Sequence, residues 1–146
     1  MNFQREPLFC AFEDLAPLAE MHNSELTRGA IPLDMNWAQY AALESAGILV
    51  LFTCREEFRL VGYSAFILAG ALHHKSLMVA QNDSLFLHPE FRRGTTALRF
   101  IDYCDGELKK LGAQKIVYHV TLAHDWRPIL HRRGFEDEEI AVTKLL

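Results

Sequence analysis

The segment from residue 48 to residue 87 constrains the fold most, because its apolar residues gather in extended runs instead of following a helical period. "ILVLFTC" (48–54) and "LVGYSAFILA" (60–69) are rich in β-branched and aromatic residues, and the charged turn "REEF" separates them. Two such runs around a short polar turn predict a β-hairpin. A third strand is expected from Ser76 to Leu87, with a bulge where "QND" (81–83) interrupts the pattern.

Helical patterns flank these strands on both sides. Before them, we expect a short strand at residues 6–11, a helix over "EDLAPLAEMHNSEL" (13–26) with Pro17 in its first turn, and a helix from Asn36 to Ser45. After them, the sequence predicts strands at 115–120 and 139–146 and a short helix within 124–133. A long helix follows the third strand directly, and its apolar stripe consists of Ala97, Ile101, Cys104, Leu108 and Leu111.

This order predicts an α/β fold with one central sheet flanked by helices. The 146 residues contain no linker or repeat, so a single domain over residues 1–146 is expected. The longest apolar run, "AGILVLF", is far shorter than the roughly 20 residues that cross a bilayer, and "MNFQREP" lacks the apolar core of a signal peptide. We therefore expect a cytoplasmic protein without a membrane segment, in which Cys10, Cys54 and Cys104 are reduced and mostly buried.

Charge is distributed unevenly along the chain. The formal net charge of −4 argues against general nucleic-acid binding. Between Arg92 and Arg133, however, nine Lys and Arg residues face four Asp and Glu residues. A basic sector of this size favours a compact anion over a long polyanion.

The stretch "SLFLHPEFRRGTTALRF" (84–100) opens this basic sector and reads as a strand, a turn and the start of a helix. The first turn of a helix presents unpaired backbone N–H groups that bind anions, and the small residues from Gly94 to Ala97 let a ligand approach the backbone. Arg92 and Arg93 add forked donors suited to phosphate. The alternative is a pair of solvated loop arginines before an ordinary helix. Neither a Walker A loop nor a dinucleotide fingerprint is present.

At this point the sequence resembles the GNAT N-acetyltransferases. Pro89-Glu90-Phe91-Arg92 matches the family's turn, Ala97 takes its last small position, and Thr95 replaces its middle glycine one residue after Gly94. "LKKLGAQKIVYHV" and "ILHRRGFEDEEIAVTKLL" resemble the family's following helix end, strand, Gly-Phe corner and last strand. The resemblance implies a mixed central sheet whose strands splay apart around an acyl-CoA slot.

The resemblance also implies roles for individual residues. Backbone amides from Arg93 through Gly94, Thr95 and Thr96 to Ala97, assisted by Arg92, would hold the pyrophosphate of acetyl-CoA. Backbone groups of Leu85, Phe86 and Leu87 would pair with the pantetheine arm, and the N–H near Leu85 would stabilise the oxyanion. These expected donor-binding residues are Leu85, Phe86, Leu87, Arg92, Arg93, Gly94, Thr95, Thr96 and Ala97.

Two side chains are candidates for proton transfer. Asp83 stands where family members place a carboxylate facing the acceptor, and is the candidate general base; its alternative role is to satisfy local N–H groups in a turn. Leu130 occupies the family's usual tyrosine position. If the short helix is one residue shorter than usual, His131 takes the place of that tyrosine as the candidate general acid, and His124 takes the place of a common asparagine; otherwise His131 is a residue of the polar helix face. No metal is expected, since the adjacent His73 and His74 point apart and lack partners at ligand spacing.

The expected function is transfer of an acetyl group from acetyl-CoA to a small-molecule or protein amine by direct attack, with acetyl-CoA as co-substrate. The loop at 27–37, with Trp37 and Tyr40, would border the acceptor pocket or simply pack in the core. Acidic side chains such as Glu25 would favour a cationic amine or form a solvated helix face. Two alternatives remain open: a non-catalytic GNAT-fold binding or interaction protein, with or without CoA, and a nucleotide-phosphate binder. A homodimer through the last strand is possible.

Overall fold

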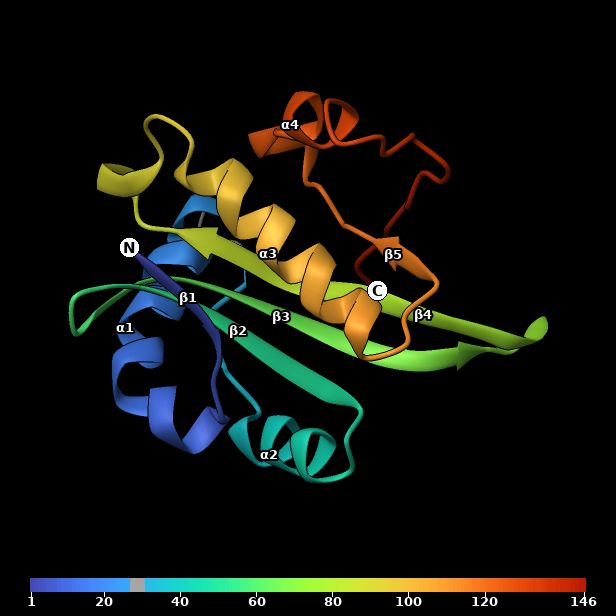
Figure 1. Cartoon of the computed structure of the whole chain (residues 1–146), viewed down its shortest axis with the longest axis horizontal. Coiled ribbons are helices and arrows are strands. Elements are labelled where there is room, and N and C mark those ends of the chain that lie inside the picture. Colours follow the sequence, from blue (N-terminus) through green and yellow to red (C-terminus); the bar gives the residue numbers. More distant parts are fainter. Residues whose placement is uncertain (27–30) are drawn as a thin grey trace.

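The computed structural model describes residues 1–26 and 31–146, and a five-stranded sheet forms its centre (Figure 1). The strands are β1 (Asn2–Arg5), β2 (Leu49–Glu56), β3 (Arg59–Ala71), β4 (His74–Leu87) and β5 (Lys115–Val117), and they are adjacent in that order. All pairs are antiparallel except β4 and β5, which are parallel. The expected α/β class, the hairpin and the third strand are confirmed.

Helices cover both faces of the sheet. On one face, α1 (Leu8–Leu26) packs with Trp37 and Tyr40 of α2 (Trp37–Ser45) against β2, β3 and β4. On the other face, α3 (Thr96–Lys110) buries Phe100, Cys104 and Leu108 against the sheet. The remaining elements are η1 (Pro89–Phe91), η2 (Leu122–His124) and α4 (Arg127–His131). None of the helices in the described part of the chain is both long and apolar enough to cross a membrane.

The stripe predicted for α3 is confirmed in its middle, since Ile101, Cys104 and Leu108 are buried, whereas Ala97 is partly buried and Leu111, just past the helix end, is exposed. Tyr103 and Tyr118 pack against the same core. The free cysteines also follow the expectation in part, because Cys54 and Cys104 are buried whereas Cys10 is exposed.

The expected strand at residues 6–11 is wrong. The first strand lies earlier, at Asn2–Arg5, and α1 begins at Leu8. Leu8, Ala11 and Leu15 are buried at helical spacing, whereas Phe9 is 81% exposed, so this apolar run forms one face of a helix. Because α1 starts early, Pro17 lies inside it and not in its first turn.

The expected strand at residues 139–146 is also wrong. The structure has no strand there, and Ile140, Val142 and Leu145 are largely exposed. A strand needs a hydrogen-bonding neighbour. β5 contributes only three residues, and among the described residues it pairs with β4 alone.

A largely buried ion pair joins Glu6, the residue after β1, to Arg55 of β2. Arg55 donates to both carboxylate oxygens of Glu6, at 2.8 and 3.1 Å, and to Asp14 at 2.8 Å. Burial alone would raise the pKa of Glu6, but hydrogen bonds from Arg55, Thr53 and Gln4 outweigh it and hold the pKa below its ordinary value.

We expect Arg55→Met to lower the free energy of unfolding by about 2 kcal/mol at pH 7, because it leaves the Glu6 carboxylate buried without its cation. The lowered pKa means that Glu6 stays charged until the pH falls through its folded-state value, below about 4.5. Once Glu6 is protonated it carries no charge for Arg55 to neutralise, so the difference in free energy of unfolding between the variant and the wild type should shrink. Urea unfolding of both proteins at pH 7 and pH 3.5 measures this difference in free energy of unfolding. An equal difference at the two pH values would contradict a charge interaction between Arg55 and Glu6.

Candidate active site

The two parallel strands separate after three residue pairs. Val79, Ala80 and Gln81 of β4 pair with β5, but β4 continues to Leu87 while the chain after β5 turns away into η2 (Figure 1). From residue 82 onward, one edge of β4 therefore has no strand beside it within the described chain. This is the splayed arrangement that the family resemblance implies.

A cavity of about 280 Å³ fills the space between the separated chains, and we call it the inter-strand cavity. Its residues come from the free end of β4, the chain after β5, the start of α3 and the end of α1. They are His22, Glu25, Leu26, Asn82, Asp83, Ser84, Leu85, Phe86, Leu87, Arg92, Ala97, Ile101, His119, Thr121, His124, Trp126 and Ile129.

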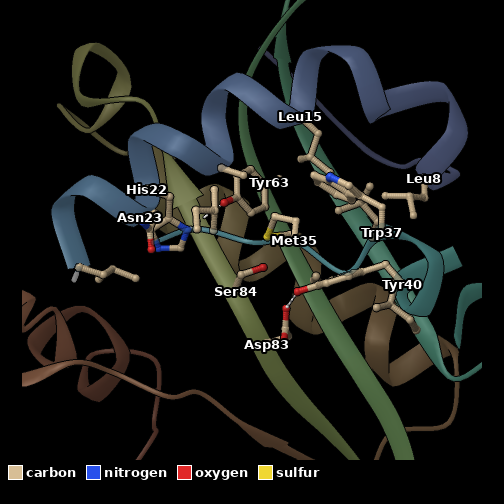
Figure 2. A pocket seen from close by; sticks show the side chains of 16 residues that line it. Leu8, Leu15, His22, Asn23, Met35, Trp37, Tyr40, Tyr63, Asp83 and Ser84 are labelled. Atoms are coloured by element: carbon tan, nitrogen blue, oxygen red, sulfur yellow. Dashed lines mark hydrogen bonds between the residues drawn. The ribbon is translucent and has the colours of Figure 1, made fainter. Parts of the chain in front are cut away.

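A second cavity of about 220 Å³ lies between the sheet, α1 and the start of α2, and we call it the α1–α2 cavity (Figure 2). Most of its lining is apolar. It is formed by Leu8, Leu15, Ala19, His22, Asn23, Leu26, Leu33, Met35, Trp37, Tyr40, Leu49, Leu51, Tyr63, Ala65, Asp83 and Ser84.

The two cavities meet at a shared set of residues: His22, Leu26, Asp83 and Ser84. Asp83 occupies this junction because β4 bulges there. Ser84 pairs with Ala65 and Asn82 pairs with Phe66, which leaves Asp83 without a partner across the hairpin. The predicted bulge is thus confirmed, and it sets Asp83 at the border of both cavities.

Side-chain hydrogen bonds fix the bulge. The buried amide of Asn82 donates to the carbonyls of Ser84 and Ala65, at 2.9 and 3.2 Å. The Tyr40 hydroxyl donates to Oδ2 of Asp83 at 2.5 Å (Figure 2). Burial, and then the adjacent carboxylate, raise the pKa of Tyr40, so its phenol remains a donor.

The side chain of His22 extends from α1 to the same junction (Figure 2). Its Nδ1 lies 2.8 Å from the Tyr63 hydroxyl, and burial raises the pKa of that hydroxyl and keeps it protonated. Burial lowers the pKa of His22, although Glu25 partly opposes the shift. The neutral imidazole is therefore favoured, which leaves a nitrogen able to accept a proton.

The turn before α3 leaves backbone groups at the start of the helix without a side-chain cap. Gly94 adopts a φ of +72°, a conformation that glycine accommodates without strain. Thr95 is the N-cap of α3 but its side chain makes no capping bond, so the first N–H groups of the helix lack that partner. Ala97 in this first turn lines the inter-strand cavity.

Arg92 is held by several contacts at the end of this cavity. Its Nε donates to the Leu87 carbonyl at 2.7 Å, and Nη2 donates to both carboxylate oxygens of Glu25, at 2.8 and 2.7 Å. The guanidinium also lies 5.3 Å from the centre of the Phe86 ring. It is therefore not a solvated loop side chain, whereas Arg93 is exposed.

The structure does not bring His131 to either cavity. His131 lies at the end of α4, is about half exposed, and its Nε2 is 2.9 Å from Oδ1 of Asp137. The lining histidines are instead His22, His119 and His124. His73 and His74 lie at the β3–β4 turn and line neither cavity, and the described residues contain no cluster of three or more metal-ligating side chains.

Sequence reasoning missed His22, Tyr63 and Asn82. His22 and Tyr63 contact each other across a sequence separation of 41, and Asn82 bonds to Ala65 of β3 as well as to the nearby Ser84. The sequence did contain a signal for His22, because it is a polar residue on the helical face that carries Leu15, Leu18 and Ala19. Residues 27–30 of the expected acceptor loop lie outside the described residues, and Met35 and Trp37 from the rest of it line the α1–α2 cavity.

Comparison with solved structures identifies the fold, although no protein-family model and no curated protein matches the sequence. A predicted acetyltransferase with acetyl-CoA from Clostridium acetobutylicum is similar at a TM-score of 0.74 and 14% identity, over 99% of this chain and 95% of that one. Ribosomal-protein-alanine N-acetyltransferase from Brucella melitensis is similar at a TM-score of 0.75 and 19% identity, over 99% of this chain and 97% of that one. An aminoglycoside acetyltransferase from an uncultured soil metagenomic sample, in complex with sisomicin, is similar at a TM-score of 0.77 and 13% identity, over 99% of this chain and 95% of that one.

These similarities extend over almost the whole chain. The protein has the fold of the GNAT acetyltransferases, as the sequence resemblance implied.

Proposed function

We propose that the protein is an N-acetyltransferase that transfers the acetyl group of acetyl-CoA to an amine by direct attack. The observation that carries the proposal is the junction of the two cavities at His22, Asp83 and Ser84, beside the free edge of β4. Donor and acceptor can enter from opposite sides and meet there, which brings the two reacting groups together.

The donor would occupy the inter-strand cavity. Its pantetheine amides would hydrogen-bond to backbone groups of Leu85, Phe86 and Leu87, at the edge of β4 that has no strand beside it and where the Leu87 carbonyl already accepts from Arg92. Its pyrophosphate would accept from the N–H groups of Arg93, Gly94, Thr95, Thr96 and Ala97 at the start of α3. The presence of an acetyltransferase with acetyl-CoA among the similar structures supports acetyl-CoA as the donor.

The acceptor amine would bind at Asp83 from the α1–α2 cavity. An amine is nucleophilic only after its ammonium loses a proton, so a base is required. Asp83 is the proposed base, and neutral His22 is a second candidate that the structure brings to the same junction. The amine nitrogen then bonds to the thioester carbonyl carbon, and the backbone N–H near Leu85 stabilises the oxyanion.

Collapse of this intermediate breaks the C–S bond. The nitrogen, which still carries one proton more than the amide product, loses that proton to solvent, and the departing CoA thiolate takes one up. We assign the proton donor to His124, which lines the inter-strand cavity, in place of His131, which lies outside it. Both residues belong to the segment that follows β5.

A non-catalytic binding protein is the second candidate function, and one observation favours it. Leu130, at the position where relatives carry a tyrosine, is buried and lines neither cavity. This candidate predicts acetyl-CoA binding without acetyl transfer to any amine.

Calorimetric titration with acetyl-CoA tests the proposed function first. We expect a dissociation constant in the micromolar range, near −8 kcal/mol, and no displacement of acetyl-CoA by equimolar ATP. Release of free thiol on addition of an amine would then separate the enzyme from the non-catalytic protein. Absence of binding heat, or equal competition by ATP, would contradict acetyl-CoA as the donor.

A further inference from the structure

We infer that the acceptor is a small primary amine with one cationic group and an apolar tail, aromatic or aliphatic. This inference rests on the proposed function and deepens it by naming the acceptor class. It comes from the α1–α2 cavity, whose two ends differ in chemistry (Figure 2).

The far end of the cavity is apolar and rigidly built. Its walls come from α1 and β2, and the buried residues there are Leu8, Leu15, Leu49 and Leu51. Trp37 borders the same space and is itself held by edge-to-face packing on Phe12, with ring centres 5.1 Å apart. A hydroxyl or ammonium placed against these walls would lose its water without gaining a partner.

The near end carries a single negative charge. Asp83 is the only acidic side chain among the described residues that line this cavity, and Tyr40 fixes one of its oxygens. The described lining contains no Lys or Arg. One carboxylate at the end of an apolar space complements one ammonium at the end of an apolar tail. It does not complement a polyamine or an aminoglycoside, which would need several acidic partners.

The volume bounds the size of the tail. About 220 Å³ corresponds to roughly seven water molecules at 30 Å³ each. An amine of about nine non-hydrogen atoms fills such a space, and 2-phenylethylamine is a probe of that size. Ethylamine would leave the apolar end unfilled.

A series of amines tests the inference without altering the protein. Thiol release from acetyl-CoA is measured with ethylamine, butylamine, hexylamine, 2-phenylethylamine, spermidine and sisomicin. We expect kcat/KM to rise about fourfold per added methylene, and 2-phenylethylamine to exceed both polycations by about 100-fold. Equal or better transfer to spermidine or sisomicin, or no dependence on tail length, would overturn the inference while leaving the proposed function intact.

The two tryptophans provide a binding readout that does not need turnover. Trp37 lines the α1–α2 cavity, whereas Trp126 lines the inter-strand cavity. In Trp126→Phe, the remaining Trp37 emission should change on addition of 2-phenylethylamine but not of spermidine. In the matched variant Trp37→Phe, the Trp126 emission should respond to acetyl-CoA.

These measurements distinguish a wrong acceptor class from a wrong donor. If acetyl-CoA binds and 2-phenylethylamine leaves Trp37 unchanged, the acceptor class is wrong but the donor site stands. If acetyl-CoA itself produces neither heat nor a Trp126 response, the proposed function fails and the acceptor class fails with it.

Discussion

Asp83→Asn is expected to lower kcat/KM for the amine by about 100-fold or more, which is the low end of the effect of removing a general acid or base. The amide keeps the shape of the carboxylate, and its oxygen can still accept from Tyr40, so the bulge should survive. The charge that attracts the ammonium and accepts its proton is lost. Because Asp83 is separate from the turn before α3, the dissociation constant for acetyl-CoA should stay within about twofold of wild type. Steady-state kinetics and calorimetry measure the two quantities.

Two matched variants show which part of the junction matters. Tyr40→Phe removes the hydrogen bond to Asp83 but keeps its charge, so its effect should be much smaller than that of Asp83→Asn. His22→Gln removes the second candidate base and keeps a polar side chain. Full activity in Asp83→Asn together with a large loss in His22→Gln would transfer the role of base to His22.

Thr95→Glu is expected to weaken acetyl-CoA binding by about 10- to 100-fold, the equivalent of losing one charged hydrogen bond. Thr95 is the exposed N-cap of α3, and a carboxylate there competes with the pyrophosphate for the first N–H groups of the helix. The same carboxylate interacts favourably with the helix dipole. The melting temperature should therefore stay the same or rise while the affinity for acetyl-CoA falls. A loss of affinity without a loss of stability excludes unfolding as the cause of the weaker binding.

Thr95→Gln is the control for the size of the new side chain, and we expect it to bind acetyl-CoA within a fewfold of wild type. Arg92→Ala is a less specific test of the same site. It removes donors near the phosphates, but it also breaks the contacts that tie Glu25 and Leu87 together. If Thr95→Glu and Thr95→Gln bind equally well, the helix start is not the phosphate site.

Elements with a clear local pattern were predictable from the sequence. The stripe of Ile101, Cys104 and Leu108 fixed the buried face of α3, and the interruption at "QND" marked the bulge. The helix expected from Asn36 also begins there, because the Asn36 side chain accepts from the backbone N–H of Gln39 and caps α2. Each of these features depends on residues within a few positions of one another.

The errors arose where distant partners decide the structure. The run after Glu6 is apolar enough for a strand, but its burial against β2, β3 and β4 makes it helical. The alternation at residues 139–146 suits a strand, yet no neighbour in the described chain pairs with it. Arg92 and Glu25 are 67 residues apart in sequence, so no local pattern predicts their ion pair.

The bulge at Asp83 also determines which side of the sheet every later residue of β4 faces. Side chains of a strand alternate between faces, so an even-numbered spacing keeps a face and an odd-numbered spacing changes it. Ala80 and Leu87 are seven residues apart, yet both belong to the core under α3, whereas Phe86 packs on the α1 side. The extra residue reverses the alternation.

Deleting Asp83 would therefore do more than remove a carboxylate. It would turn Leu85 and Leu87 towards α1 and Phe86 towards α3, and thereby exchange the contributions of this strand to the two cores. A change of side chain at Asp83 tests chemistry, but a change of chain length there would invert the strand. Asp83 would therefore both bind the amine and determine which face of the sheet each later side chain of β4 occupies.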